Sequence, residues 1–418
     1  MKVLLVHNFY QQPGGEDQVF QSEFDLLRAN GHEVNAYHER NDSIVRGSIR
    51  LAVNTIWNHS HYRRLLATIQ SLAPDVVHVH NTFPQISPAV YYAARDRGAS
   101  VVQTLHNYRL LCPSATLFRA GQLCDSCLGK GLAWPGIKHA CYRNSAAATA
   151  TVSAMVSIHK LVGTWSSLVD RYIVLSEFAR GLFVRGGFPA EKVSVKSNFV
   201  EPDPGFIAAP GQRAVFVGRL TEEKGISTLL AAWRSIGGRL PLDIIGDGPL
   251  AFLAADAAAH IPGVRWLKWL PREEVFNVLR EAYIAIVPSV WYEPFGLIVS
   301  EAFAIGVPLI ASASGGLEKM ISSGRTGLLF QSGDASDLTA KVLWALDHPD
   351  EIAGMRIHAR KEFERRYTAA ANYKSLVGIY EGALESRRQG KQARSAIREE
   401  PKCTCDRISG GRIDPNGS

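Results

Sequence analysis

The chain has 418 residues, 46% of them hydrophobic and 20% charged. This length exceeds that of one ordinary domain and predicts two globular domains. The composition is that of folded proteins and excludes disorder of the whole chain. The net charge of +7 lies in residues 1–200, which contain 20 Lys and Arg against 13 Asp and Glu. A basic half could bind anionic lipid or a phosphorylated acceptor, or it could be an ordinary solvated surface. It has no dense Lys/Arg tract with interleaved aromatic residues, so we expect no nucleic acid partner.

The N-terminus lacks the pattern of a secretory signal. Its apolar run, residues 3–6, reaches only four residues before His7, and this length indicates a strand. Residues 145–158 are rich in Ala, Ser and Thr and fall short of the roughly 20 apolar residues that a membrane span requires. We therefore expect a cytoplasmic protein without a transmembrane segment, whose basic first half allows peripheral contact with the inner face of the membrane.

Short apolar runs alternate with longer amphipathic segments, which predicts strands and helices in alternation. The strands expected in the first half are residues 3–7, 32–37, 76–80, 101–105 and 172–175. The pattern pauses in a Pro/Gly-rich connection near residues 198–211 and then resumes. The second set of expected strands is residues 214–217, 242–245, 264–267, 284–287 and 308–311. Nearly continuous apolar runs of this kind indicate parallel sheets covered by helices on both faces.

These patterns predict an α/β protein of two Rossmann-like, doubly wound domains, residues 1–198 and 203–365. A helical segment is expected at residues 366–386, and the polar stretch 387–418 is expected to be a disordered tail. Ligands of open α/β sheets bind outside the carboxyl ends of the strands. Two such domains would therefore face each other across one cleft, and candidate residues should directly follow strands.

Four of the six cysteines have the spacing C-x11-C-x2-C-x13-C in the first half; they are Cys112, Cys124, Cys127 and Cys141. Six cysteines in a chain of this length are too few for a disulfide scaffold. This low number is consistent with a reducing compartment. The central C-x2-C could chelate one ion and the outer two cysteines could complete a structural zinc site. The irregular outer spacing equally fits unrelated buried or surface thiols, and both interpretations stay open.

The strongest chemical pattern follows the expected strand at 284–287, where Glu293 and Glu301 form an E-x7-E pair in PSVWYEPFGLIVSE. Pro294 suits the first turn of a helix, whose free backbone amides would point at a phosphate. These amides belong to Phe295, Gly296 and Leu297. A carboxylate at Glu301 can accept two ribose hydroxyls, and Glu293 can reach the sugar.

A second pattern, FVGRLTEEKG, follows the first strand of the second domain and carries Arg219 and Lys224. An enzyme that breaks a bond to a diphosphate must stabilise the developing negative charge with a metal or with fixed cations. These two side chains would bracket a pyrophosphate and make a catalytic metal unnecessary. In isolation such charges are usually solvated, but their place directly after a strand favours the functional interpretation.

Together these segments closely resemble the retaining GT-B glycosyltransferases of family 4, or group 1, over nearly the whole chain. The resemblance also includes IGDGP at 245–249, WLPREEV at 269–275 and GVPLIASASGGLE at 306–318. It implies a GT-B fold with an acceptor-binding first domain, a donor-binding second domain and a last helix that returns to the first. It further implies that Glu301 binds the ribose and that Glu293 and the backbone of residues 295–297 hold the donor sugar. The diphosphate would be held by Arg219 and Lys224.

In the first domain the resemblance points to the glycine loop after the first strand, where the backbone of Gly14 and Gly15 would approach the donor phosphate. Without the resemblance, Pro-Gly-Gly is an ordinary turn. His106 stands where the family places a histidine near the donor sugar, although a core or capping histidine is the alternative. Four residues are thus predicted to be catalytic: His106, Arg219, Lys224 and Glu293.

Another expected strand ends in His78, His80 and Asn81, of which His80 and Asn81 are predicted to contact the acceptor. The H-x-H spacing could indicate a metal site, but no carboxylate accompanies it at a suitable spacing, and residues i and i+2 of a strand share a face in any case. Lys268 departs from the family, which commonly has Gly just before Pro271. Because Lys268 lies where the base edge is usually read, the donor base is less predictable.

The resemblance implies a hexosyltransferase (EC 2.4) of polysaccharide biosynthesis that needs no cofactor. It would move a sugar from a nucleoside-diphosphate sugar to a glycan, lipid-linked or small-molecule acceptor, with retained configuration and no obvious enzyme nucleophile. Two alternatives remain open. One is a nucleotide-sugar hydrolase or epimerase of the same fold, and the other is a non-catalytic nucleotide-sugar-binding protein.

Overall fold

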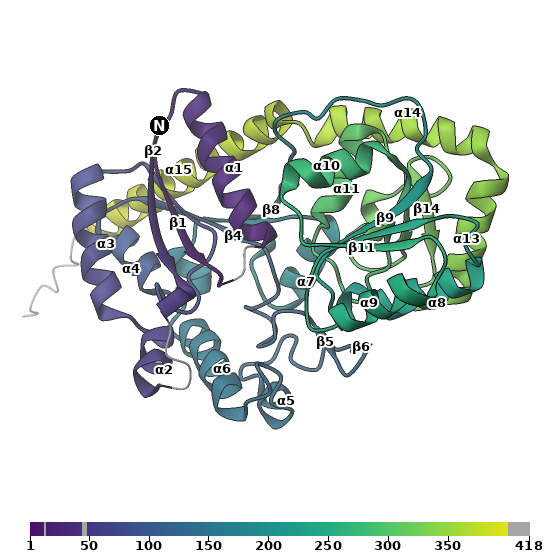
Figure 1. Ribbon diagram of the computed structural model, residues 1–418. Coiled ribbons are helices and arrows are strands. Elements are labelled where there is room, and N and C mark those ends of the chain that lie inside the picture. Colours follow the sequence, from purple (N-terminus) through teal and green to yellow (C-terminus); the bar gives the residue numbers. More distant parts are fainter. Residues whose placement is uncertain (12–13, 44–47, 400–418) are drawn as a thin grey trace, which may run out of the picture.

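The computed structural model describes residues 1–11, 14–43 and 48–399. It consists of two lobes, each built on a six-stranded sheet, and the last helix runs back along the first lobe (Figure 1). All ten strands expected from the sequence are present. The pattern misses the outer strands β8 (Val193–Val195) and β14 (Gly327–Phe330), which are only three and four residues long.

The first sheet has the order β2-β1-β3-β4-β7-β8, and every neighbouring pair is parallel. Its remaining strands are β1 (Lys2–Phe9), β2 (Glu33–Arg40), β3 (Val76–Val79), β4 (Ser100–Leu105) and β7 (Arg171–Val174). The helices of this domain are α1 (Gly15–Ala29), α2 (Ile49–Ile56), α3 (His59–Leu72), α4 (Ala89–Asp96), α5 (Trp134–Lys138), α6 (Ala146–Leu161) and α7 (Glu177–Arg185). A two-stranded ribbon, β5 (Phe118–Arg119) and β6 (Gln122–Leu123), lies outside the main sheet.

The second sheet has the order β11-β10-β9-β12-β13-β14, again with all neighbours parallel. Its strands other than β14 are β9 (Arg213–Val217), β10 (Leu242–Ile245), β11 (Val264–Lys268), β12 (Ala282–Val287) and β13 (Leu309–Ser312). The helices are α8 (Ile226–Ile236), α9 (Ala251–His260), α10 (Arg272–Arg280), α11 (Leu297–Ile305), α12 (Leu317–Met320), α13 (Ala335–Asp347) and α14 (Pro349–Arg366). Numbered along the chain, this order is 3-2-1-4-5-6, the arrangement of dinucleotide-binding sheets.

Both faces of the first sheet are covered, because successive residues of a strand face opposite sides. Leu4 and Val6 of β1 pack into the larger core of the domain, whereas Val3 and Leu5 face a second core. That second core is completed by three buried side chains of α15 (Ala369–Glu399), namely Leu376, Tyr380 and Ala383. The chain thus returns to its first domain to cover a sheet face that would otherwise expose apolar side chains.

The tail predicted to be disordered from residue 387 starts too early, because α15 continues to Glu399. Residues 387–399 contain no proline and are dominated by good helix formers, so the helix has no reason to stop there. Their polar composition alone gave the wrong indication. The rest of the predicted tail, residues 400–418, lies outside the described residues.

Each sheet has one point at which the order of its strands reverses, and ligands of open α/β sheets bind at such points. In the first sheet the point lies between β1 and β3, and in the second between β9 and β12. The loops that leave these four strands carry most of the candidate residues: Gly14 and Gly15, His80 and Asn81, Arg219 and Lys224, and Glu293. The topology therefore selects the same loops as the motifs.

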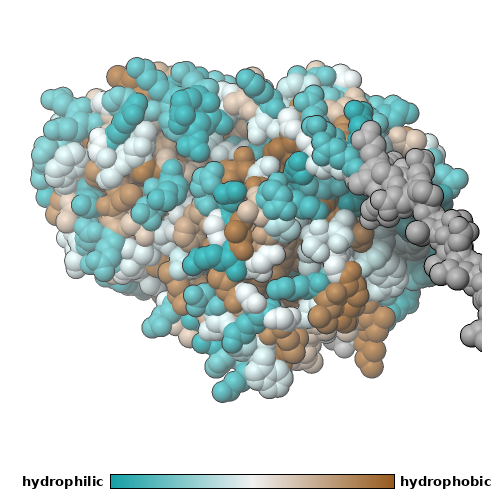
Figure 2. All heavy atoms as spheres, turned by 180° about the vertical axis from the view of Figure 1, so that it is seen from behind, coloured by the Kyte–Doolittle hydropathy of each residue, from teal (hydrophilic) through white to brown (hydrophobic). Residues whose placement is uncertain are grey.

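The rear surface shows a hydrophobic area at its lower edge, on the side of the first domain that carries α2 and α6 (Figure 2). These two helices pack against each other. Their exposed apolar side chains are Ile49, Val53, Ile158 and Leu161, followed by Val162 just after α6. Within the described residues, no helix has the length and hydropathy needed to cross a bilayer.

Candidate active site

An ion pair joins the two loops at the reversal point of the second sheet. Lys224 ends a short 3₁₀ turn (Glu222–Lys224) after β9, and Glu293 lies in the loop after β12. The Nζ atom of Lys224 lies 2.9 and 2.8 Å from the two carboxylate oxygens of Glu293. Glu293 is buried, with 6% of its surface exposed, and the side chain of Lys224 is 20% exposed. The two residues, which the sequence analysis assigns to one donor site, are therefore in direct contact; their roles there stay predictions.

The carboxylate of Glu293 is held by two further donors from its own loop. Ser289 Oγ donates to Oε2 at 3.0 Å and Trp291 Nε1 donates to the same oxygen at 2.9 Å. Lys224 also lies over the Trp291 ring, 5.3 Å from its centroid. Charge-assisted hydrogen bonds of this kind are stronger than neutral ones, so Lys224 is fixed before any ligand arrives.

Glycine lets the two loops come this close. At Gly225, which has φ +72°, a Cβ would lie 1.9 Å from the carbonyl oxygen of Pro288. Any other residue would push the Lys224 loop away from the end of β12. Arg219, in contrast, is not fixed: its side chain is 66% exposed and its guanidinium lies 3.4 Å from Glu223. One cation held by Glu293 and one exposed cation therefore flank this end of the sheet.

Helix α11 begins at Leu297, three residues later than the sequence predicts from Pro294. The reason is Gly296, whose φ of +83° and ψ of 83° lie outside the helical region and make it the residue before the first turn. Phe295 and Gly296 thus belong to the loop that leads into the helix, whereas Leu297 is the first helical residue. The helix N-terminus still faces the other domain, as an anion site would require.

The glycine loop of the first domain meets this helix. Gly15 is the first residue of α1, and a Cβ there would lie 2.7 Å from Cδ1 of Leu297. Gly14, directly before α1, is exposed. Pro13 lies outside the described residues. The N-termini of α1 and α11 therefore face each other where the domains meet, and both direct positive dipole ends toward the same region.

Glu301 lies on α11, one turn after its start, and is buried with 7% of its surface exposed. One carboxylate oxygen lies 3.3 Å from Nε of Arg272 and 3.4 Å from Nε2 of Gln18. Arg272 opens α10 and also donates to the carbonyl of Glu201 at 2.8 Å. These long contacts leave Glu301 able to exchange its partners for ligand hydroxyls.

The histidines of the first domain form a buried cluster around Glu23 of α1. Its Oε2 atom lies 3.7 Å from Nδ1 of His78 and 3.5 Å from Nε2 of His80, while Oε1 accepts from Lys196 Nζ at 2.6 Å. The sequence has no carboxylate at a suitable spacing from the H-x-H pair, but the fold brings the Glu23 carboxylate beside both rings. Glu23 is 55 residues away along the chain, so sequence spacing could not reveal it, and the Lys196 ammonium already supplies the cation.

His106 belongs to the same cluster. Its Nε2 lies 3.0 Å from Nδ1 of His80, and the two rings stack with centroids 5.2 Å apart. Burial lowers the pKa of both rings, so both are neutral at physiological pH. Asn81 is engaged locally: it donates to the carbonyl of Asn8 at 2.8 Å and accepts from the backbone of Phe83 at 2.9 Å. The catalytic role of His106 and the acceptor roles of His80 and Asn81 stay predictions.

Two buried histidines of the first domain, His78 in this cluster and His61 on α3, predict how stability depends on pH. Burial lowers the pKa of His78 to about 3 and that of His61 to about 4, from an ordinary value of 6.5. Between pH 6.5 and these values the unfolded chain binds protons that the folded chain does not, so stability is full above pH 6.5 and falls as the pH drops below it. We expect the melting temperature to decrease steadily from pH 6.5 to pH 5.

Differential scanning fluorimetry at pH 8, 6.5, 5.75 and 5 measures this dependence. The variant His61→Gln has one such group fewer and should show a shallower decrease. A melting temperature that stays level or rises on acidification would contradict the prediction.

Family models match both domains of the chain: "Glycosyl transferase 4-like domain" at residues 14–198 and "Glycosyl transferases group 1" at residues 204–362. The chain belongs to the group 1 glycosyltransferases. Solved structures agree on a GT-B fold. The Anabaena protein HepE, in complex with UDP, covers 95% of this chain and 100% of its own at 14% identity and a TM-score of 0.64. Sucrose-phosphate synthase from Thermosynechococcus elongatus covers 94% and 99% at 17% identity and a TM-score of 0.66.

Curated relatives match over shorter stretches. The amylovoran biosynthesis glycosyltransferase AmsK of Erwinia amylovora is 29% identical over 211 residues, which is 47% of this chain and 52% of AmsK. A glycogen synthase of Mycobacterium tuberculosis is 32% identical over 181 residues, 42% of this chain and 44% of the synthase. The phosphatidyl-myo-inositol mannosyltransferase of Mycobacterium leprae is 28% identical over 180 residues, 42% and 48% of the two chains. The chain thus matches about half the length of these relatives.

The structure of this group 1 glycosyltransferase adds residues to which the sequence analysis gives no role, including Arg272 of the WLPREEV segment. Arg272 and Gln18 contact Glu301, as described above, and Glu16 in the first turn of α1 accepts hydrogen bonds from Asn107 and, at 2.9 Å, from Tyr10. Their position in the sequence is the available signal, since Glu16 and Arg272 each lie in the first turn of a helix that follows a strand. Lys268 has φ +59° at the end of β11, the left-handed conformation that a glycine adopts most easily.

Proposed function

We propose that this chain transfers a sugar, with retained anomeric configuration, from a nucleoside-diphosphate sugar to a hydroxyl acceptor. The observation that carries the proposal is the Lys224–Glu293 pair at the reversal point of the second sheet, directly beside the N-terminus of α11. This place combines a cation, a helix N-terminus that can bind an anion, and carboxylates that can hold a sugar. It lies on the domain whose strand order is that of nucleotide-binding sheets.

In the reaction, the bond between C1 of the sugar and the phosphate oxygen breaks and the acceptor oxygen bonds to C1. The electron pair of the broken bond remains on the diphosphate, which also takes the proton of the acceptor hydroxyl. Lys224, fixed by Glu293, and Arg219, drawn in from solvent, stabilise the charge that develops on the diphosphate. Lys224, which Glu293 holds in place before the donor binds, supplies charge stabilisation that a catalytic metal would otherwise provide.

Glu301 binds the ribose hydroxyls, and the approach to α11 at residues 295–297 holds the sugar and its phosphate. The first domain closes the site from the other side, because Gly15 faces Leu297 and Gln18 reaches Glu301. Ser176, the N-cap of α7, also donates to the carbonyl of Pro294 at 2.8 Å. These contacts between the domains help to exclude water, which would otherwise compete with the acceptor.

Relatives support this choice of substrates without naming them for this chain. HepE is described in complex with UDP-glucose, which supports a nucleotide-sugar donor. AmsK acts in amylovoran biosynthesis, and the mycobacterial relative is a phosphatidyl-myo-inositol mannosyltransferase. We therefore infer a glycan or lipid-linked acceptor, bound by the first domain. The apolar area on α2 and α6 would allow a peripheral encounter with a lipid surface.

A thermal-shift screen against UDP-, GDP- and ADP-sugars tests the donor site. A ligand present at about 100 times its dissociation constant stabilises the folded state by about 2.7 kcal/mol. We expect one nucleotide class to raise the melting temperature and the variant Glu301→Gln to lose this shift. Glu351→Gln, an exposed glutamate at the start of α14, is the matched control and should keep it. A wild-type protein that responds to none of the three classes would contradict the assignment.

A further inference from the structure

The connection between β4 and α6 is unusually long for its content of regular structure. Residues 106–145 contain only the two-residue strands β5 and β6 and the five-residue helix α5. Loops longer than about 15 residues without their own secondary structure are uncommon in compact domains. This connection, which we call the cysteine loop, carries all four clustered cysteines and therefore calls for a specific source of order.

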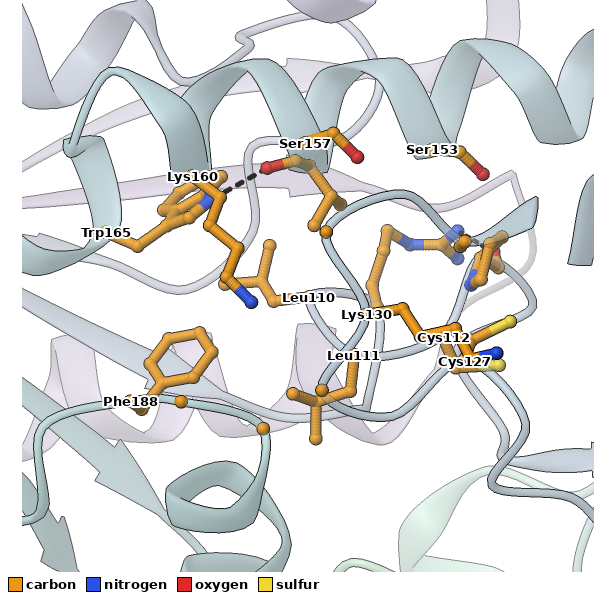
Figure 3. A pocket seen from close by; sticks show the side chains of 18 of the residues that line it. Leu110, Leu111, Cys112, Cys127, Lys130, Ser153, Ser157, Lys160, Trp165 and Phe188 are labelled. Carbon is orange, nitrogen blue, oxygen red and sulfur yellow. Dashed lines mark hydrogen bonds between the residues drawn. The ribbon is translucent and has the colours of Figure 1, made fainter. Parts of the chain in front are cut away.

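The four cysteines come from three separate turns of the cysteine loop and line one small pocket. Cys112 closes a turn by donating its amide to Tyr108, Cys124 and Cys127 follow β6, and Cys141 follows α5. The side chains of Cys112 and Cys127 also both line the edge of a neighbouring hollow (Figure 3). All four thiols are free.

We propose that Cys112, Cys124, Cys127 and Cys141 bind one structural zinc ion as a tetrahedral four-thiolate site. Binding forms four zinc–sulfur bonds of about 2.3 Å and releases the four thiol protons, with no oxidation or reduction. The sulfurs stand further apart in the structure than in a closed site, so binding turns the side chains inward. The spacing C-x2-C supplies the chelating pair that structural zinc sites use.

The surroundings of the pocket fit this ion better than others. Within the part of the chain that the structure describes, its lining contains no aspartate, glutamate or histidine. The donor set is therefore soft sulfur, which selects zinc over magnesium, calcium or manganese. Arg119 lies in the same lining and is close enough to Cys141 to interact with its charge, which offsets part of the negative charge of four thiolates. The backbone of Gly136 hydrogen-bonds the Cys127 sulfur, an outer contact that orients a ligand.

The zinc would have a consequence for the donor site, although its existence does not depend on the proposed function. The turn between β5 and β6 reaches the second domain, where a Cβ at Gly121 would lie 3.1 Å from the carboxylate of Glu222. Glu222 opens the short turn that ends at Lys224. A cysteine loop held by zinc would therefore support the loop that carries the fixed cation.

Elemental analysis by plasma mass spectrometry, on full-length protein purified without chelator or metal-affinity resin, tests the proposal. We expect one zinc per chain in the wild type and none in Cys124→Ser/Cys127→Ser. The pair Cys403→Ser/Cys405→Ser is the matched control and should keep one zinc. The proposal is overturned if the wild type contains no zinc or contains iron instead. It is also overturned if zinc is lost only from the control pair.

A second measurement on the wild type covers the case that the cysteine variant does not fold. Titration with a mercurial in the presence of a zinc-sensitive dye should release one zinc as four thiols react. Reconstitution with Co²⁺ should give the intense thiolate charge-transfer bands and the visible bands of a tetrahedral site. Intact-mass analysis that finds disulfides among these four cysteines, or zinc release uncoupled from thiol reaction, would contradict the proposal.

Discussion

Replacing Lys224 by alanine should lower kcat by about 10² to 10³-fold, the loss typical when one preorganised group that stabilises developing charge is removed. Among residues 1–11, 14–43 and 48–399, Lys224 is the only cation bonded to Glu293, and the exposed Arg219 side chain lies against Glu223 instead. The change removes charge stabilisation where the diphosphate leaves. It therefore acts on kcat more than on KM.

Steady-state release of nucleoside diphosphate, for the donor found in the thermal-shift screen, measures this effect. Lys341→Ala, which removes a half-exposed lysine of α13, is the matched control and should turn over like the wild type. Circular dichroism should show that both variants are folded. An unchanged kcat in folded Lys224→Ala would remove the charge-stabilising role from the account.

Replacing Lys196 by methionine should destabilise the first domain by about 3–5 kcal/mol, because it leaves the buried carboxylate of Glu23 without its partner. The two side chains are 1% and 0% exposed and 2.6 Å apart. Lys196 also lies 3.4 Å from Oδ1 of Asn372, so the pair connects α1, the end of β8 and α15. Urea unfolding followed through its first transition measures the loss.

The double variant Glu23→Gln/Lys196→Met distinguishes two costs: that of leaving one buried charge unpaired and that of losing the contact itself. Because removal of both charges leaves nothing unpaired, it should recover most of the stability that Lys196→Met loses. Arg239→Met breaks the exposed pair with Asp347 and should cost less than about 1 kcal/mol. A single variant as stable as the wild type would contradict the account of this cluster.

The sequence predicts the strands well because each is a short apolar run that helices cover. Residues 76–79 illustrate this: all four are buried, and the strand lies where the pattern places it. The donor loops are equally predictable, since Lys224 and Glu293 directly follow strands that are neighbours in the sheet. A position just after a strand can be recognised from the local sequence. Because the strands are parallel, residues at such positions lie close together at the same edge of the sheet.

What the sequence cannot show depends on contacts between distant residues or on single backbone angles. Glu23 and Lys196 are 173 residues apart, and the carboxylate beside the H-x-H pair comes from α1. Helix α11 starts late because of one angle at Gly296, although Pro294 is a favourable first residue. The sequence underestimates the length of α15 because its polar composition resembles that of a disordered tail, while its individual residues favour a helix.

The most direct test is the release of nucleoside diphosphate from the stabilising nucleotide sugar, measured with and without glycan or lipid-linked acceptor preparations. Transfer to a hydroxyl acceptor predicts slow release with donor alone and a large stimulation by one acceptor class, with the sugar recovered on the acceptor in its original anomeric configuration. Release that is equally fast in water alone would show a hydrolase and contradict the account, and so would a bound donor that no acceptor consumes.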